Sequence, residues 1–111
     1  MQREIKKYLF DIDGCIENIE NFVGEPKLFS NFEQNTMLQQ AVERNFEIIG
    51  EAVNSILKID PEIKITDARR MVDMRNKIIH GYDEIHPVQI WNIIINHLPL
   101  LKQEVQLLLE N

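Results

Sequence analysis

The residues from 74 to 82, Met-Arg-Asn-Lys-Ile-Ile-His-Gly-Tyr, bring together the side chains of this chain that are best suited to chemistry. The imidazole of His80 can act as a general acid or base near neutral pH. The guanidinium of Arg75 can stabilise negative charge that develops on a phosphate. The two side chains suit cleavage of a phosphodiester bond without a metal, and Asn76 and Tyr82 are further polar groups beside them.

A helix must position these side chains if they are to share one surface. Apolar residues recur at helical spacing through the segment, and Gly81 is a typical residue just beyond a helix end. We therefore expect a short helix that ends at or near His80. Asn76 and His80 then share a face, whereas Arg75 lies about 100° round from Asn76 and reaches across with its long side chain.

The residues alone also allow a structural interpretation. About 0.14 Arg-x4-His pairs are expected by chance in this composition, so the spacing by itself is weak support for catalysis. His80 would then place a cation at a helix C-terminus, which stabilises a helix by roughly 0.3–1 kcal/mol. Arg75 would be a solvated surface charge, and Tyr82 a packed aromatic residue at the helix end.

A polar stripe on the preceding helix is a second candidate part of the site. Arg44, Glu47 and Glu51 repeat at intervals of three and four residues, which places them on one side of a helix. They are either ordinary surface charges or carboxylates that orient the arginine and histidine of the motif. Gly50 in the same helix costs roughly 1 kcal/mol relative to alanine, and close approach of another helix would compensate for it.

Helical periodicity extends over the rest of the chain, and no segment alternates at the period of a strand. The predicted helices are 3–22, stopped by Gly24 and Pro26; 36–58, capped by Asn35 or Thr36; a motif helix that Thr66 or Asp67 caps; and a last helix whose first turn holds Pro87. We expect an all-α, up-and-down bundle of these four main helices, with a short additional turn near Pro61.

The last helix has apolar residues on several faces, more than a monomer surface accommodates. This excess predicts a partner surface, most simply that of a homodimer. Pro99 within the helix is expected to kink it. The connection before the second helix is expected to place Phe29 and Phe32 on the core.

Length and composition limit the kind of protein. A chain of 111 residues with 44% hydrophobic residues is expected to form one domain, 1–111, with its own core. No apolar stretch reaches the ~18 residues that span a bilayer, and no secretory signal opens the chain, so we expect a soluble cytoplasmic protein without a membrane partner. Cys15 is expected to be a small buried residue, His86 and His97 to be structural, and no spacing suggests a zinc site.

The charge is unevenly distributed along the chain. A net charge of −6 argues against a protein that coats nucleic acid without specificity. Residues 64–77 nevertheless carry five cations and two anions, a local balance of +5 − 2 = +3. These cations are either ordinary solvated charges or a basic strip that can steer a phosphate to a local site; they are Lys64, Arg69, Arg70, Arg75 and Lys77.

The stretch from Arg75 to Tyr82, Arg-Asn-Lys-Ile-Ile-His-Gly-Tyr, resembles the R-x4-H-x-Y signature of the HEPN superfamily. More specifically, it is similar to the HepT-type toxins of HepT/MntA toxin-antitoxin systems. The order of elements agrees with that family: an amphipathic first helix, a second helix with Glu-Ile-Ile-Gly-Glu-Ala at 47–52, an Asp60-Pro61 loop, the motif helix, and a last helix opening near Trp91. The similarity extends over nearly all of the chain.

The resemblance implies a HEPN-like fold and a metal-independent endoribonuclease that needs no cofactor. In such an enzyme a ribose 2′-hydroxyl attacks the neighbouring phosphate of the RNA substrate. His80 exchanges protons, Arg75 stabilises the added negative charge, and Asn76 helps to position the group. The resemblance also implies a homodimer in which two motif helices lie close together.

The same resemblance implies a partner and a form of control. A cognate MntA-like nucleotidyltransferase antitoxin would add AMP to the motif tyrosine, which corresponds to Tyr82. The added phosphates would pair with the neighbouring cationic side chains and block the substrate. The alternatives are a non-catalytic HEPN helical module that binds a nucleotidyltransferase or a nucleotide, and a helical dimer that has lost activity.

Overall fold

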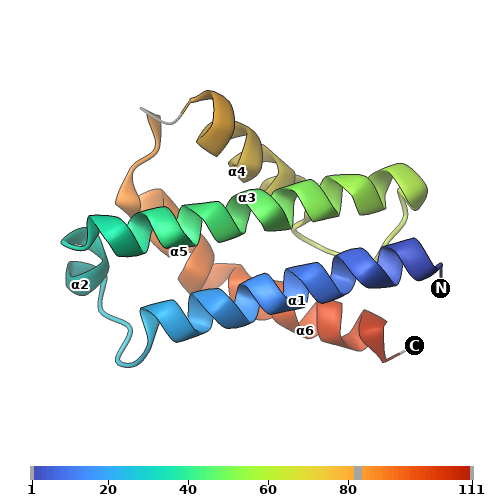
Figure 1. Cartoon of the computed structure of the whole chain (residues 1–111), viewed down its shortest axis with the longest axis horizontal. Helices are drawn as coiled ribbons and strands as arrows, with labels where there is room; N and C mark the ends of the chain where they lie inside the picture. Colours follow the sequence, from blue (N-terminus) through green and yellow to red (C-terminus); the bar gives the residue numbers. More distant parts are fainter. Residues whose placement is uncertain (1, 82–83, 111) are drawn as a thin grey trace.

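The computed structural model describes residues 2–81 and 84–110, and the regular structure in those two ranges is entirely helical (Figure 1). This confirms the all-α prediction. Within the described ranges there are six helices: α1 (Arg3–Val23), α2 (Phe29–Glu33), α3 (Thr36–Ile59), α4 (Ala68–His80), α5 (Pro87–Asn96) and α6 (Leu98–Leu109).

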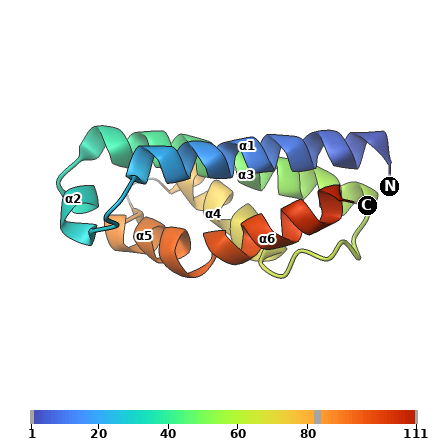
Figure 2. The ribbon, with the colours of Figure 1, turned by 90° about the horizontal axis from the view of Figure 1, so that it is seen from below.

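The helices form two layers. The long helices α1 and α3 lie side by side and antiparallel, and α4, α5 and α6 lie on one side of this pair (Figure 2). Helix α1 begins and α6 ends at the same end of the molecule (Figures 1 and 2). None of the described helices is long and apolar enough to cross a membrane.

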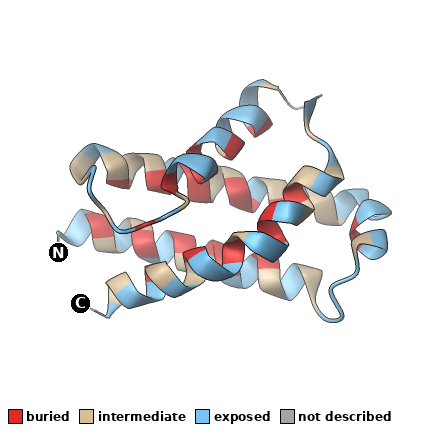
Figure 3. Ribbon diagram, turned by 180° about the vertical axis from the view of Figure 1, so that it is seen from behind, coloured by how far each residue is buried: buried red, intermediate tan, exposed pale blue. Residues whose placement is uncertain are grey.

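The core lies where the helices face one another (Figure 3). The apolar stripe predicted for the first helix is buried, because its members recur every three or four residues and so share one side of α1. The matching side of α3 supplies several fully buried side chains. Each such aliphatic or aromatic side chain contributes roughly 1.5–3 kcal/mol when it leaves water; among them are Leu9, Ile12, Ile19, Val42, Phe46, Ile49 and Ile56.

Local signals set the ends of the long helices, as predicted. The Oδ1 atom of Asn35 accepts a hydrogen bond of 3.0 Å from the N–H of Leu38 and so caps the start of α3. Helix α1 ends at Gly24, whose φ of 64° is readily adopted only by glycine. The N–H of Gly24 donates to the carbonyl of Glu20 at 2.9 Å.

A turn forms at Pro61 as predicted, and the N–H of Ile63 donates across it to the carbonyl of Asp60 at 3.2 Å. A five-residue helix, α2, in the connection before α3 was not predicted. Its aromatic residues pack against Trp91 of α5, with ring centroids 6.0 Å away for Phe29 and 5.3 Å away for Phe32. Phe32 is buried, so the expectation that this connection covers the core is confirmed.

The prediction of one kinked last helix was wrong, because the segment forms two helices that meet at His97. Pro99 lies in the first turn of α6, where a residue without an N–H interrupts no helical hydrogen bond. Each helix buries one side within the chain, whereas Ile95, Leu100 and Leu107 of the apolar excess remain exposed. Residues buried within the chain are Ile90, Ile93, Ile94, Leu98, Leu101 and Val105.

Candidate functional site

The motif helix α4 ends where the sequence predicted, with His80 as its last residue. The N–H of Gly81 donates to the carbonyl of Lys77 at 2.8 Å, and Gly81 ends the helix with a φ of −138°, which is outside the left-handed region. His80 and Asn76 are both exposed to solvent. In Figure 1 the last turns of α4 extend beyond α3.

Arg75 lies where α4 crosses α3. A Cβ atom added to Gly50 would come within 2.3 Å of the Cβ of Arg75 and within 2.7 Å of the carbonyl oxygen of Met71. Real Cβ atoms do not approach other heavy atoms so closely, and the two helices can therefore touch here only because residue 50 has no side chain. The predicted close approach at Gly50 is confirmed.

The guanidinium of Arg75 is only partly satisfied by its surroundings. Its Nη1 donates a hydrogen bond of 3.3 Å to the Oδ1 of Asn76. Its Nε is buried and has no hydrogen-bond partner among the described residues. An N–H that is buried without a partner costs roughly 1–3 kcal/mol, and more when the group is charged.

Arg75 and His80 leave α4 in different directions. Five residues at about 100° each place the two side chains about 140° apart around the helix. Asn76 lies between them in this angular order and already binds the guanidinium. Within a single chain, the imidazole and the guanidinium therefore flank Asn76 and do not face each other.

The carboxylates of Glu47 and Glu51 on α3 were predicted either to orient Arg75 and His80 or to be ordinary surface charges. The Nη1 of Arg44 donates a hydrogen bond of 3.1 Å to the Oε2 of Glu47, and the two side chains form the ordinary surface ion pair that was one of the two alternatives. Glu51 is exposed. In residues 2–81 and 84–110, no hydrogen bond joins either glutamate to Arg75 or His80, and their role in orienting these side chains stays a prediction.

Two other ionisable groups on the helices have perturbed environments. Partial burial, followed by the charge of Glu47 one turn away, raises the pKa of Glu43 above its ordinary value. Burial, with the nearby charge of Asp11, raises the pKa of the Cys15 thiol, which is buried as predicted. The described residues hold no group of three or more His, Cys, Asp or Glu side chains that could bind a metal ion.

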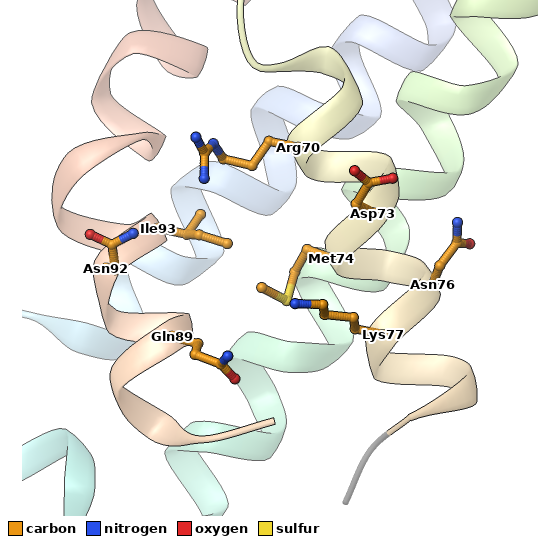
Figure 4. A pocket seen from close by; sticks show the side chains of 8 residues that line it. All are labelled: Arg70, Asp73, Met74, Asn76, Lys77, Gln89, Asn92 and Ile93. Atoms are coloured by element: carbon orange, nitrogen blue, oxygen red, sulfur yellow. The ribbon is translucent and has the colours of Figure 1, made fainter. Parts of the chain in front are cut away.

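A groove of about 730 Å³, which was not predicted from the sequence, lies between α4 and α5 (Figure 4). It combines cations, amides, one carboxylate and an apolar floor. Asn76 at its edge is the one lining residue that also belongs to the predicted catalytic set. The lining residues are Arg70, Asp73, Met74, Asn76, Lys77, Gln89, Asn92 and Ile93.

Tyr82, the predicted site of modification, lies outside the described residues. The basic strip of residues 64–77, which precedes Tyr82 in the sequence, is largely exposed. Arg69, Arg70 and Lys77 are open to solvent, whereas Arg75 is half-buried. One of these cations is neutralised locally, because the Nε of Arg70 lies 3.5 Å from the Oδ1 of Asp67.

Comparison with known proteins gives a consistent picture. The family model described as Ribonuclease HepT-like matches residues 12–108. The chain is 39% identical over 106 residues to "Probable ribonuclease HepT" of Thermococcus cleftensis, an alignment that covers 92% of this chain and 93% of that protein.

Two proteins of Methanocaldococcus jannaschii are similar over almost their whole length. "Putative RNase MJ1380" is 32% identical over 108 residues, which cover 96% of this chain and 97% of that protein. "Putative RNase MJ0125" is 30% identical over 111 residues, which cover 99% and 95%. No solved structure matches the chain significantly.

Proposed function

The chain belongs to the HepT-like ribonuclease family, and from that membership we propose that it is a metal-independent endoribonuclease that acts as the toxin of a toxin-antitoxin pair. The observation that carries the proposal is how the side chains of His80 and Arg75 are placed on the motif helix α4. His80 is exposed at its end, and the half-buried Arg75 donates a hydrogen bond from its Nη1 to the side chain of Asn76. We expect the imidazole and the guanidinium to contact an RNA phosphate.

In the proposed reaction the ribose 2′-oxygen attacks the adjacent phosphorus while an imidazole takes the 2′-hydroxyl proton. The new O2′–P bond forms as the P–O5′ bond breaks, and an imidazolium gives a proton to the leaving O5′. The products are a 2′,3′-cyclic phosphate and a 5′-hydroxyl end. Arg75 donates hydrogen bonds to the non-bridging oxygens as their charge increases, and Asn76 holds the guanidinium in place.

We further propose that a homodimer forms the complete site. The reaction needs both a base and an acid, whereas each chain supplies one motif histidine. The divergence of Arg75 and His80 around α4 supports this arrangement, because a second motif helix could bring its own histidine to a phosphate bound by Arg75. The proposed substrate of this homodimer is RNA, and the proposal includes no membrane partner.

The chemistry of the products tests this function. The purified protein is expected to cleave single-stranded RNA in excess EDTA and to leave 2′,3′-cyclic phosphate and 5′-hydroxyl ends, which mass spectrometry of the fragments identifies. A single 2′-deoxynucleotide at the cleaved position removes the nucleophile and should abolish cleavage there. Loss of activity in EDTA, or fragments with 3′-hydroxyl and 5′-phosphate ends, would indicate attack by water and reject the mechanism.

Control by a nucleotidyltransferase antitoxin is the second part of the proposal. Tyr82 follows His80 by two residues, so AMP on its hydroxyl would bring phosphates near the cationic motif side chains. Protein produced together with the cognate nucleotidyltransferase is expected to carry AMP on the peptide that contains Tyr82, and to lose ribonuclease activity. The chain has one other tyrosine, Tyr8, which provides a matched control.

The two tyrosine variants separate the outcomes. Tyr82→Phe should remain unmodified and active in the presence of the antitoxin enzyme, whereas Tyr8→Phe should be modified as the wild type is. Peptide mapping by mass spectrometry reads the modification directly. An adduct that persists in Tyr82→Phe would assign the control to another residue.

A further inference from the structure

We propose that the groove between α4 and α5 holds a nucleotide of the RNA strand next to the cleaved phosphate, and that it prefers a base with a keto group. The proposal rests on the proposed ribonuclease function and adds a substrate-binding subsite to it. The backbone phosphate of this nucleotide would lie at Lys77, and its base between the amides of Gln89 and Asn92 (Figure 4).

The size and floor of the groove suit a nucleotide. Its volume of about 730 Å³ falls in the range of roughly 300–1,000 Å³ that is usual for small-molecule sites. Met74 of α4 and Ile93 of α5 line it and are 8% and 3% exposed, so they offer an apolar surface against which a base can lie. The polar side chains lie around this floor (Figure 4).

The charges of the groove place the phosphate at one end. The ammonium of Lys77 has no ion-pair partner within the described residues. Arg70, by contrast, contacts Asp67 at 3.5 Å and has Asp73 one turn further along α4, so its end of the groove is nearly neutral. A phosphate is therefore attracted to Lys77, which lies three residues before His80 and about 60° from it around α4.

The amides of α5 are oriented to donate hydrogen bonds. The Oε1 of Gln89 accepts a hydrogen bond of 2.9 Å from the N–H of His86. The Oδ1 of Asn92 accepts one of 2.7 Å from the Nδ2 of Asn96. With both oxygens engaged, each amide has its NH₂ group free to donate within the described part of the chain.

Two donors at one site favour a base that presents acceptors. Uracil and guanine carry a carbonyl oxygen where cytosine and adenine carry an amino group, and an amino group would meet the amide donors without forming a hydrogen bond. The groove is therefore expected to select uracil or guanine over cytosine or adenine. Asp73 at the neutral end disfavours a second phosphate there.

Binding to RNA that is not cleaved tests the phosphate contact. The His80→Ala protein provides a non-cleaving parent, and fluorescence anisotropy with labelled single-stranded oligonucleotides measures its affinity across a range of KCl concentrations. Adding Lys77→Gln should weaken binding to every oligonucleotide by about tenfold at low salt and reduce the slope of log K against log[salt] by about 0.7. Lys58→Gln, which removes another exposed lysine from the last turn of a helix, should change neither.

The base preference is tested in the same assay. The parent should bind oligonucleotides of uracil about tenfold more tightly than those of cytosine, and Asn92→Ala should bring this ratio close to one without changing the salt dependence. Asn31→Ala, which changes an exposed asparagine of α2, should keep the ratio. Unfolding midpoints equal to that of the parent show that these variants are folded.

The outcomes separate this inference from the function on which it rests. Unchanged affinity in Lys77→Gln together with an unchanged base ratio in Asn92→Ala would overturn the groove as a subsite. RNA cleavage that the wild type performs and His80→Ala lacks would still support the ribonuclease in that case. Absence of RNA binding by the parent at every salt concentration would overturn the groove proposal as well.

Discussion

Replacement of His80 by alanine is expected to lower the rate constant for RNA cleavage by about 10²- to 10⁴-fold, the usual effect of losing a positioned acid or base. The side chain is exposed at the last residue of α4, so the substitution removes the imidazole without opening a cavity in the core. Single-turnover cleavage of a labelled RNA, with enzyme in excess, measures the chemical step directly. Affinity for uncleaved RNA should change much less than the rate.

The other histidines and the stability of the fold provide controls. His86→Ala changes a second exposed histidine at a helix end and should leave the rate close to that of the wild type. Loss of a cation from the C-terminus of α4 should lower the free energy of unfolding of His80→Ala by no more than roughly 1 kcal/mol. If the His80→Ala protein cleaves as fast as the wild type, the catalytic role of His80 is rejected. His80 would then be a cation at a helix end, and the protein a non-catalytic binding module.

Replacement of Arg75 by alanine is expected to lower cleavage by about 10²- to 10³-fold, because one charged donor to the developing phosphate charge is lost. Arg75→Lys should restore little of this, since an ammonium cannot present the planar fork that binds two phosphate oxygens at once. The rate constant in single-turnover assays should fall in both variants. The proposed proton transfer by His80 should be retained in both variants.

Stability distinguishes a catalytic from a structural role for Arg75. The buried Nε of Arg75 has no partner among the described residues, so the alanine variant no longer has the cost of that unpaired N–H. The variant also loses the packing of the aliphatic part of the arginine side chain, which acts in the opposite direction. The free energy of unfolding of Arg75→Ala should therefore change little. The control is Arg69→Ala, which removes an exposed arginine of the same helix and should keep full activity. Equal losses of activity in Arg75→Ala and Arg69→Ala would indicate a general effect of charge and no specific role for Arg75.

The main helices could be predicted from the sequence because their signals are local and repeated. Apolar stripes of many members defined α1 and α3 to within one residue at each end, and the Asn35 cap and the Gly24 stop set two of these ends. The motif helix ended at His80 as expected. The short α2 escaped prediction, because five residues hold too few turns to show a period.

The break at His97 and the groove depend on contacts that are distant in sequence. Pro99 is compatible with a kink or with the first turn of a new helix, and the packing of α5 and α6 decides between them. In the structure the Nδ1 of His97 lies 3.1 Å from the Oδ2 of Asp67, thirty residues earlier. The groove likewise joins residues 70–77 to residues 89–93, and these polar side chains look like ordinary surface residues when either segment is considered alone.

Because α3 and α4 cross at Gly50, this glycine should tolerate substitution much less well than Gly14, the other glycine within a helix of the described residues. Gly14 of α1 has no atom within 4 Å of the place where a side chain would begin, so substitution there meets open space. At Gly50 even a methyl group must push α4 outward and carry Arg75 with it. A saturation survey of the chain should therefore find Gly50 nearly as intolerant of substitution as the motif itself, although Gly50 has no side chain and lies on another helix.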